Sequence, residues 1–278
     1  MRLHLVVIAA ERNGYFQARF TRMDHMSSRV QPPTFGAYVR HCRITGELSR
    51  TELAAAADIS LSYVTKLEQG VAVNPSAERI DKLADALQVS EVQRQHLHDL
   101  VSFDQVPPGS VDDRLPGDEI SDILHQHVDH LVPHLAAYVD ASWNVLHANA
   151  EYTRIYRHIT EPAVANVLIW FFQVSESQAI MLEWEDEARL TVAWMRSLMV
   201  RHPGSRLFGE LLTRLSTSRD FRQMWAMQEV LMGRRRPYMW VHDLDHGQDI
   251  RLNAQVYTAP DPSQRIQLYL GVRTDIPT

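Results

Sequence analysis

Apolar positions recur with helical spacing between residues 34 and 103, and they alternate in strand-like fashion near the end of the chain. Ile80, Leu83, Ala84 and Leu87, for example, follow the i, i+3, i+4, i+7 spacing of one helix face. Similar runs, separated by serine caps and turn residues, predict five short helices in this region. We therefore expect an all-α N-terminal domain.

The helix pair predicted within residues 49–70 carries the clearest functional signal. Ser49 and Ser60 are placed to cap the two helices, and Asp58 lies at the turn between them, where Asp tolerates a left-handed backbone. The second helix should end at Gly70. Two short helices joined by a tight turn are typical of a helix-turn-helix, whose second helix can enter the DNA major groove. The alternative interpretation is a pair of ordinary surface helices.

From residue 119 onward, amphipathic helices are mixed with alternating strand-like runs. Together these runs predict an α+β fold of the PAS-like kind, with an antiparallel sheet of about five strands. The expected strands are 136–141, 145–149, 238–243, 250–258 and 266–272, and the expected helices are 119–131, 151–158, 167–172, 177–201, 205–215 and 219–232.

Pro and Gly divide the 278-residue chain, which is long enough for two domains. Consecutive prolines end an irregular extension, residues 1–33. A second Pro- and Gly-rich stretch, residues 104–118, indicates a linker. The predicted domains are a DNA-binding domain at 34–103 and a PAS-like ligand-binding and dimerisation domain at 119–278.

Composition narrows the class of protein. The single cysteine, Cys42, excludes an internal disulfide framework and a cysteine-based zinc site. No apolar run approaches the roughly 20 residues of a membrane span, so a cytoplasmic location is expected. Residues 34–103 hold seven basic and nine acidic side chains, so DNA binding must depend on where the basic groups lie.

The helix pair resembles the lambda-repressor/Xre type of helix-turn-helix, which often ends in Glu-x-Gly, here Glu68-Gln69-Gly70. The later runs LVPHLAAYVDASWNVLHANA, NVLIWFF, LEWEDEARLTVAWMRSLMVRHPG and LLTRLSTSRDFRQMWA resemble the ligand-binding domain of MmyB-like transcription regulators. The resemblance covers about residues 34–275. It implies a transcription regulator of the Xre family with double-stranded DNA as partner and a fatty-acid-like molecule as ligand.

Contacts with DNA are expected at the exposed start of the second helix. Hydroxyls and a lysine there can reach base edges, and the capping serine can reach phosphate. An arginine at the start of the first helix is placed to reach the DNA backbone, although a solvated surface charge is an equal alternative. The predicted DNA-binding residues are Arg50, Ser60, Leu61, Ser62, Tyr63, Thr65 and Lys66. For Tyr63, packing within the domain remains open. We expect a homodimer that binds two half-sites.

A ligand pocket is predicted from the second half of the chain, which holds all six tryptophans and most of the methionines. Binding pockets are mostly apolar with a few polar groups, and methionine adapts to irregular ligands. The predicted ligand-binding residues are Trp143, Asn149, Trp170, Phe171, Trp184, Trp194, Met195, Arg196, Met224 and Trp225. The alternative is that these residues fill the core. Arg196 could bind a carboxylate, or pair instead with Glu185, Asp186 or Glu187.

Other chemistry finds little support. The histidines of HQHVDHLVPH fit an exposed helix face better than a metal site, because Pro133 should end that helix. Hydrolase, P-loop and dinucleotide-binding motifs do not occur, so no catalytic residues and no certain cofactor are expected. The favoured function is a DNA-binding regulator that senses a small apolar ligand. The alternative is a constitutive dimeric DNA-binding protein whose second domain is an interaction module without ligand.

Overall fold

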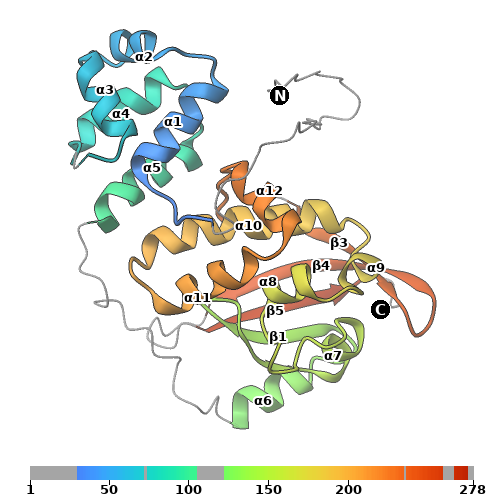
Figure 1. The fold of residues 1–278 in the computed structure, drawn as a ribbon. Helices are drawn as coiled ribbons and strands as arrows, with labels where there is room; N and C mark the ends of the chain where they lie inside the picture. The colour runs from blue at the N-terminus through green and yellow to red at the C-terminus, as the bar shows by residue number, and fades with distance from the viewer. Residues whose placement is uncertain (1–29, 72–73, 105–121, 235, 259–265, 275–278) are drawn as a thin grey trace.

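The computed structural model describes residues 30–71, 74–104, 122–234, 236–258 and 266–274. A helical domain, coloured blue to green in Figure 1, is followed by an α+β domain, coloured green to red. This arrangement confirms the predicted fold class. Most of the predicted extension and most of the predicted linker fall outside the described residues.

The helical domain has five helices whose first four begin at a hydroxyl cap. In each of these four, a Ser or Thr side chain accepts a hydrogen bond from the backbone N–H three residues further on. Their apolar faces meet in one buried cluster that includes Val39, Leu53, Val64, Leu83 and Leu97. The helices are α1 (Phe35–Thr45), α2 (Arg50–Ala56), α3 (Leu61–Glu68), α4 (Ala77–Ala86) and α5 (Glu91–Asp104).

Gly36 allows α1 to pass close to the end of α3. A Cβ built on Gly36 would lie 2.1 Å from the backbone oxygen of Leu67, too close for any real contact. The absence of a side chain is therefore a packing requirement here.

Gly36→Ala is expected to destabilise the helical domain by about 1–3 kcal/mol, because α1 and α3 must separate to admit the methyl group. Calorimetric unfolding measures this loss. Gly209→Ala is the matched control, since a Cβ on Gly209 meets no atom within 4 Å and its helix should gain about 0.5–1 kcal/mol. Equal effects of the two substitutions would contradict the packing explanation.

The α+β domain contains one antiparallel sheet with the strand order β2-β1-β5-β4-β3. The pairing of β1 with β5 brings together segments separated by more than 120 residues of chain. The strands are β1 (Leu135–Asp140), β2 (Val145–Ala148), β3 (Tyr238–Asp243), β4 (Gln248–Thr258) and β5 (Ile266–Arg273).

Helices inserted between β2 and β3 pack against one face of this sheet and build the main core with it. In Figure 1, α8 and α11 lie in front of the strands and α10 and α12 lie above them, while α6 (Asp122–Asp129) lies near β1. A smaller apolar cluster joins α6 to the opposite face through Val128, Ala136 and Tyr138. The inserted helices are α7 (Ala150–Ile155), α8 (Val167–Gln173), α9 (Ser177–Ile180), α10 (Trp184–Arg201), α11 (Arg206–Leu215) and α12 (Arg219–Ala226).

The single helix predicted over 177–201 is divided into α9 and α10. Met181 forms an isolated bridge with Val241, and the N–H of Leu182 donates to the carbonyl of Trp240 at 3.2 Å. The intervening residues thus hydrogen-bond to the edge strand β3. Tertiary pairing overrides the local helical pattern at this point.

Candidate DNA-reading helix and ligand cavity

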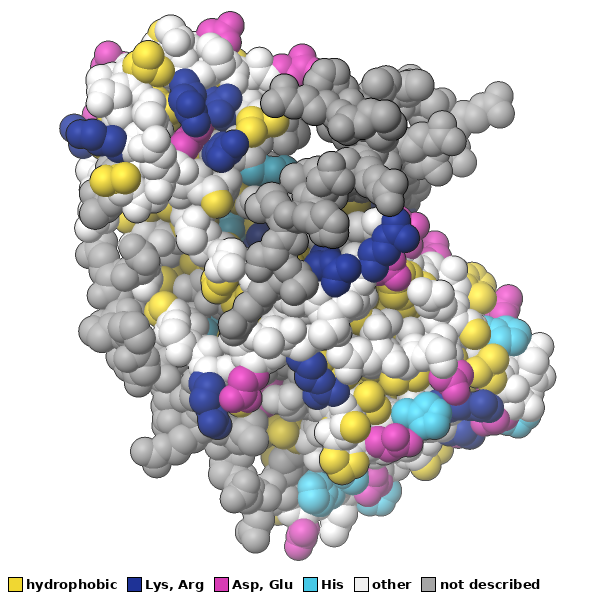
Figure 2. All heavy atoms as spheres, in the orientation of Figure 1, with side chains coloured by type: hydrophobic (Ala, Val, Ile, Leu, Met, Phe, Trp, Pro, Cys, Tyr) yellow, Lys and Arg dark blue, Asp and Glu magenta, His cyan; other side chains and the backbone are white. Residues whose placement is uncertain are grey.

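One face of α3 is exposed to solvent. Leu61 has 47% of its surface exposed, and Ser62 and Lys66 are also exposed, whereas Val64 and Leu67 are buried in the domain core. Figure 2 shows basic side chains grouped on this helical domain. The helix therefore has the free face that groove binding requires.

The remaining predicted DNA contacts have structural partners of their own. Ser60 caps α3 by accepting from the N–H of Tyr63 at 3.1 Å, and Thr65 donates to the carbonyl of Leu61 at 2.9 Å. Tyr63 is half-buried with Arg79 over its ring, 5.3 Å from the centroid. Contact with DNA by these residues stays a prediction.

Glu68, at the end of α3, ties three helices together. Its carboxylate accepts from Arg43 Nε at 2.5 Å, Arg43 Nη2 at 3.1 Å and Arg50 Nε at 2.8 Å. Burial acts to raise the pKa of Glu68, but hydrogen bonds from Arg43 and Arg50 outweigh it, and the pKa lies below its usual value. Arg43 is buried in this network, while Arg50 remains partly exposed and could still approach a DNA phosphate.

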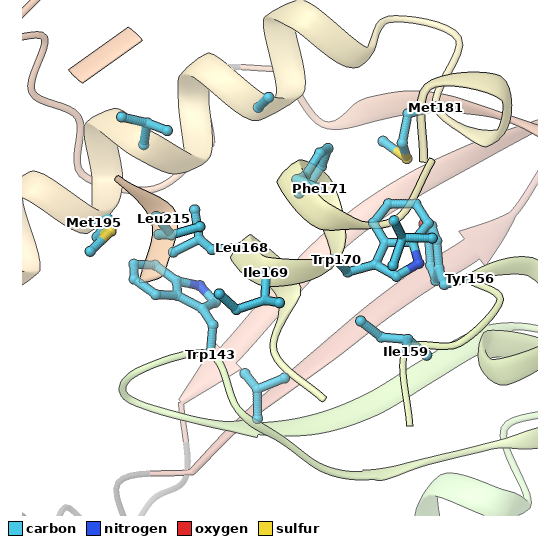
Figure 3. Close-up of a cluster of buried hydrophobic side chains, with 14 of the residues drawn as sticks. Trp143, Tyr156, Ile159, Leu168, Ile169, Trp170, Phe171, Met181, Met195 and Leu215 are labelled. Carbon is cyan, nitrogen blue, oxygen red and sulfur yellow. The ribbon is translucent and has the colours of Figure 1, made fainter. Parts of the chain in front are cut away.

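An apolar cavity lies between the sheet and the inserted helices. Its volume is about 90 Å³, which is smaller than the roughly 300–1,000 Å³ of drug-sized ligand sites. Of the residues predicted to bind ligand, the structure brings Trp170, Phe171 and Trp194 together in its wall. Figure 3 shows Trp170 and Phe171 beside Tyr156 and Ile159, which also line the cavity.

Four predicted ligand residues lie in the core around the cavity. Trp143 packs edge-on against Trp194, with ring centroids 5.8 Å apart, and its Nε1 donates to the hydroxyl of Tyr269. Trp184 donates to the carbonyl of Phe171 at 3.2 Å. Met195 and Met224 are buried in the surrounding core. None of the four is in the lining of this cavity.

Asn149 is fully buried, but it holds backbone rather than facing the cavity. Its side-chain oxygen accepts from the N–H groups of Tyr152 at 2.9 Å and Ala136 at 3.3 Å, and its amide donates to the carbonyl of His134 at 2.9 Å. It thereby caps α7 and joins it to β1. These hydrogen bonds to the backbone explain why an asparagine is buried here without a ligand.

Arg196 and Trp225 lie near the helical domain, away from the cavity. The guanidinium of Arg196 stacks on the Trp225 ring at 4.0 Å and donates to the Trp225 carbonyl, while Trp225 Nε1 donates to the carbonyl of Gln31 at 3.1 Å. Arg196 is only 2% exposed, and its Nε has no hydrogen-bond partner among the described residues. Burial lowers the pKa of Arg196 to about 10.

The second half of α10 joins the two domains. Val200 packs within the helical domain's core cluster, and Arg201 Nε donates to Asp99 Oδ2 of α5 at 2.9 Å. Leu190 and Trp194, nearer the middle of the same helix, contribute to the cavity wall. One helix therefore contacts both the cavity and the helical domain.

His96 of α5 is buried beside this junction. Its ring stands edge-on to Tyr38 at 4.7 Å, and both of its nitrogens lack a hydrogen-bond partner among the described residues. Burial, reinforced by the positive charges of Arg196 and Arg201 and opposed by Asp99, lowers the pKa of His96 to about 3. The histidine is therefore neutral at pH 7.

Sequence reasoning missed two charged groupings. Glu187, considered as a partner for Arg196, instead pairs with Arg234 in the cavity wall, at 2.7 Å for both nitrogen–oxygen contacts. The Glu68 network was also missed. Only Glu68 could have been singled out from the sequence, because it belongs to the Glu-x-Gly motif that ends the helix pair. Nothing in the sequence links Glu187 to a residue 47 positions away.

The remaining candidates gain no new role. His147 contacts Asp129 at 2.9 Å, and its ring lies 4.3 Å from that of His125, but the described residues contain no group of three metal-binding side chains with suitable geometry. Burial raises the pKa of the Cys42 thiol to about 11. Within the described part of the chain, no helix is long and apolar enough to cross a membrane.

Two known families match parts of this chain. A family described as the MmyB-like transcription regulator ligand binding domain matches residues 120–273, and a helix-turn-helix domain family matches residues 34–97. These matches cover the cavity and the α2–α3 pair respectively. No curated protein sequence is matched by this chain.

Proposed function

Because the chain belongs to the MmyB-like transcription regulator family, and is thus a DNA-binding regulator with a ligand-binding domain, we propose that it senses a small apolar molecule. The molecule binds in the cavity between the sheet and the inserted helices and changes how the helical domain engages DNA. The protein works as a homodimer in the cytoplasm, where its operator lies.

The position of α10 is the observation that supports this proposal. Trp194 lies in the cavity wall, and Arg201, two turns further along the same helix, pairs with Asp99 of the helical domain. A shift of α10 on ligand binding would therefore move groups that contact α5. The ligand must bind one arrangement of α10 more tightly than the other, because equal affinity shifts no equilibrium.

Solvent extraction and mass spectrometry of the purified protein, together with binding to its own upstream DNA, test the proposal. We expect a stoichiometric apolar compound whose removal or addition changes DNA affinity. Intact DNA binding without any ligand would favour the constitutive dimer with an interaction module. Absence of any DNA binding by the wild-type protein would contradict its role as a DNA-binding regulator.

Lys66→Ala should weaken operator binding about tenfold and reduce the salt dependence by about one released counterion, because Lys66 is the exposed cation on α3. Fluorescence anisotropy at several salt concentrations measures both quantities. Lys82→Ala is the matched control, since Lys82 lies on α4 and pairs with Glu78 at 3.2 Å. Unchanged affinity and salt slope in Lys66→Ala would overturn the placement of α3 on DNA.

A further inference from the structure

The carboxylate of Glu68 is shared by two arginines that differ in exposure. The side chain of Glu68 is fully buried and that of Arg43 is 11% exposed, whereas that of Arg50 is 41% exposed. Two guanidinium groups around one carboxylate leave one positive charge uncompensated. Because Arg43 is buried in the domain, Arg50 presents that charge to solvent.

Arg43 makes the carboxylate of Glu68 a fixed anchor. Its Nε and Nη2 donate to the two oxygens of Glu68, and its Nη1 donates to the carbonyl of Leu48 at 2.7 Å. A bidentate pair of this kind holds the carboxylate in one orientation. Glu68 therefore does not turn to follow a moving partner.

Arg50 is held by only one of its nitrogens. Its Nε donates to Glu68 Oε2 at 2.8 Å, and neither of its terminal nitrogens has an acceptor among the described residues. Because a guanidinium is planar and rigid, holding Nε also fixes the edge that carries Nη1 and Nη2. That edge has the geometry to donate to two oxygens of one phosphate.

The position of Arg50 in the fold suits such a contact. It is the first residue of α2, directly after the N-cap Ser49. In helix-turn-helix proteins the first helix of the pair crosses the DNA backbone while the second lies in the major groove. A side chain that is already held loses less conformational freedom when it binds, so its contact is stronger than that of a freely moving arginine.

We propose that Glu68 is a positioning residue for DNA binding, which holds Arg50 so that its two terminal nitrogens bind one backbone phosphate at the start of α2. This inference rests on DNA reading by the α2–α3 pair. It gives Glu68 a part in DNA binding besides joining the helices, although its own negative charge repels DNA. A phosphate contact carries no sequence information, so it should act on any duplex.

Arg50→Lys tests the positioning while leaving the pair of Glu68 and Arg43 intact. Lysine keeps the charge but has neither Nε nor a second edge. With full-length protein, Arg50→Ala should weaken binding about tenfold, and Arg50→Lys at least threefold, both to a labelled duplex of the protein's own upstream DNA and to a random duplex of equal length. Arg94→Lys is the matched control, because Arg94 is also held by carboxylates but lies on α5.

Glu68→Gln separates positioning from simple charge. Removal of a negative charge would by itself strengthen DNA binding, whereas loss of positioning should weaken it at least threefold. That loss should disappear in the Arg50→Ala background, so the double variant should bind like Arg50→Ala. Fluorescence anisotropy measures the affinities at a temperature where circular dichroism shows every variant to be folded.

Contrary results are equally definite. Arg50→Lys binding as tightly as wild type, Glu68→Gln binding as tightly or more tightly, or an equal loss from Glu68→Gln with and without Arg50 would overturn the positioning role. Each of these leaves DNA reading by α3 in place. If wild type bound neither duplex, both the positioning role and the DNA-binding part of the proposed function would be overturned.

Discussion

Lowering the pH from 6.5 towards 3 is expected to destabilise the junction between the two domains through His96. The pKa of His96 is about 3 in the folded protein, well below its ordinary value of 6.5. Across this window the unfolded chain binds a proton that the folded protein does not. The free energy of unfolding therefore does not depend on the protonation of His96 above pH 6.5. Below that pH it falls by about 1.4 kcal/mol per pH unit.

His96→Phe should remove most of this slope, because phenylalanine can keep the edge-on packing against Tyr38 and cannot be protonated. At pH 7 the variant should be as stable as wild type or more so by about 1 kcal/mol, since it removes two buried nitrogens that have no partner among the described residues. Urea unfolding at pH 7, 6 and 5 measures both effects.

Two features make this test selective. His41 also has a lowered pKa, caused by burial and then by Arg196, so a smaller slope of the same sign should remain. His130→Gln is the matched control, because His130 is exposed and its replacement should leave the slope unchanged. A wild-type slope in His96→Phe would contradict the assignment.

Glu68→Gln is expected to reduce stability by about 3 kcal/mol, because it leaves the buried Arg43 and the half-exposed Arg50 without their shared anion. Chemical denaturation monitored by circular dichroism measures the loss. Glu78→Gln is the matched control, since Glu78 forms an exposed i,i+4 pair with Lys82 that should contribute only about 0.3–0.5 kcal/mol.

The pH dependence of the Glu68 contribution follows from its lowered pKa. Stability from Glu68 is complete above the ordinary glutamate pKa of 4.5 and is lost as the pH falls through the lower folded value. The contribution of Glu68 is therefore lost at lower pH than the first part of the His96 contribution, which begins to fall at pH 6.5. If Glu68→Gln proved as stable as Glu78→Gln, the network would not hold the three helices together.

Local patterns predicted the framework of the fold because they act over a few residues. Ser49 and Ser60 cap the helices for which they were proposed, and Asp58 has the left-handed backbone expected at the turn, with φ of 53°. The alternating runs at the end of the chain pair as the predicted antiparallel strands.

The details of the site depend on contacts that no local pattern encodes. Whether a tryptophan lines a cavity or supports its wall depends on side-chain direction, which distinguishes Trp194 from Trp143. Arg196 lies on a face of α10 different from that of Trp194, and its aromatic partner Trp225 is 29 residues away. Sequence reasoning identified the aromatic content of the domain but could not assign each ring.

The contacts that Val30 and Gln31 make with the second domain limit how domains could be exchanged between regulators of this family. The N–H of Val30 donates to Ser216 Oγ at 3.3 Å and the carbonyl of Gln31 accepts from Trp225, while Val200 packs in the core of the helical domain. The DNA-reading unit thus includes pieces of its neighbour. A recombination joint placed between the two domains would cut through shared packing, so a functional chimaera must carry the matching surfaces of α10 and α12 along with the reading head.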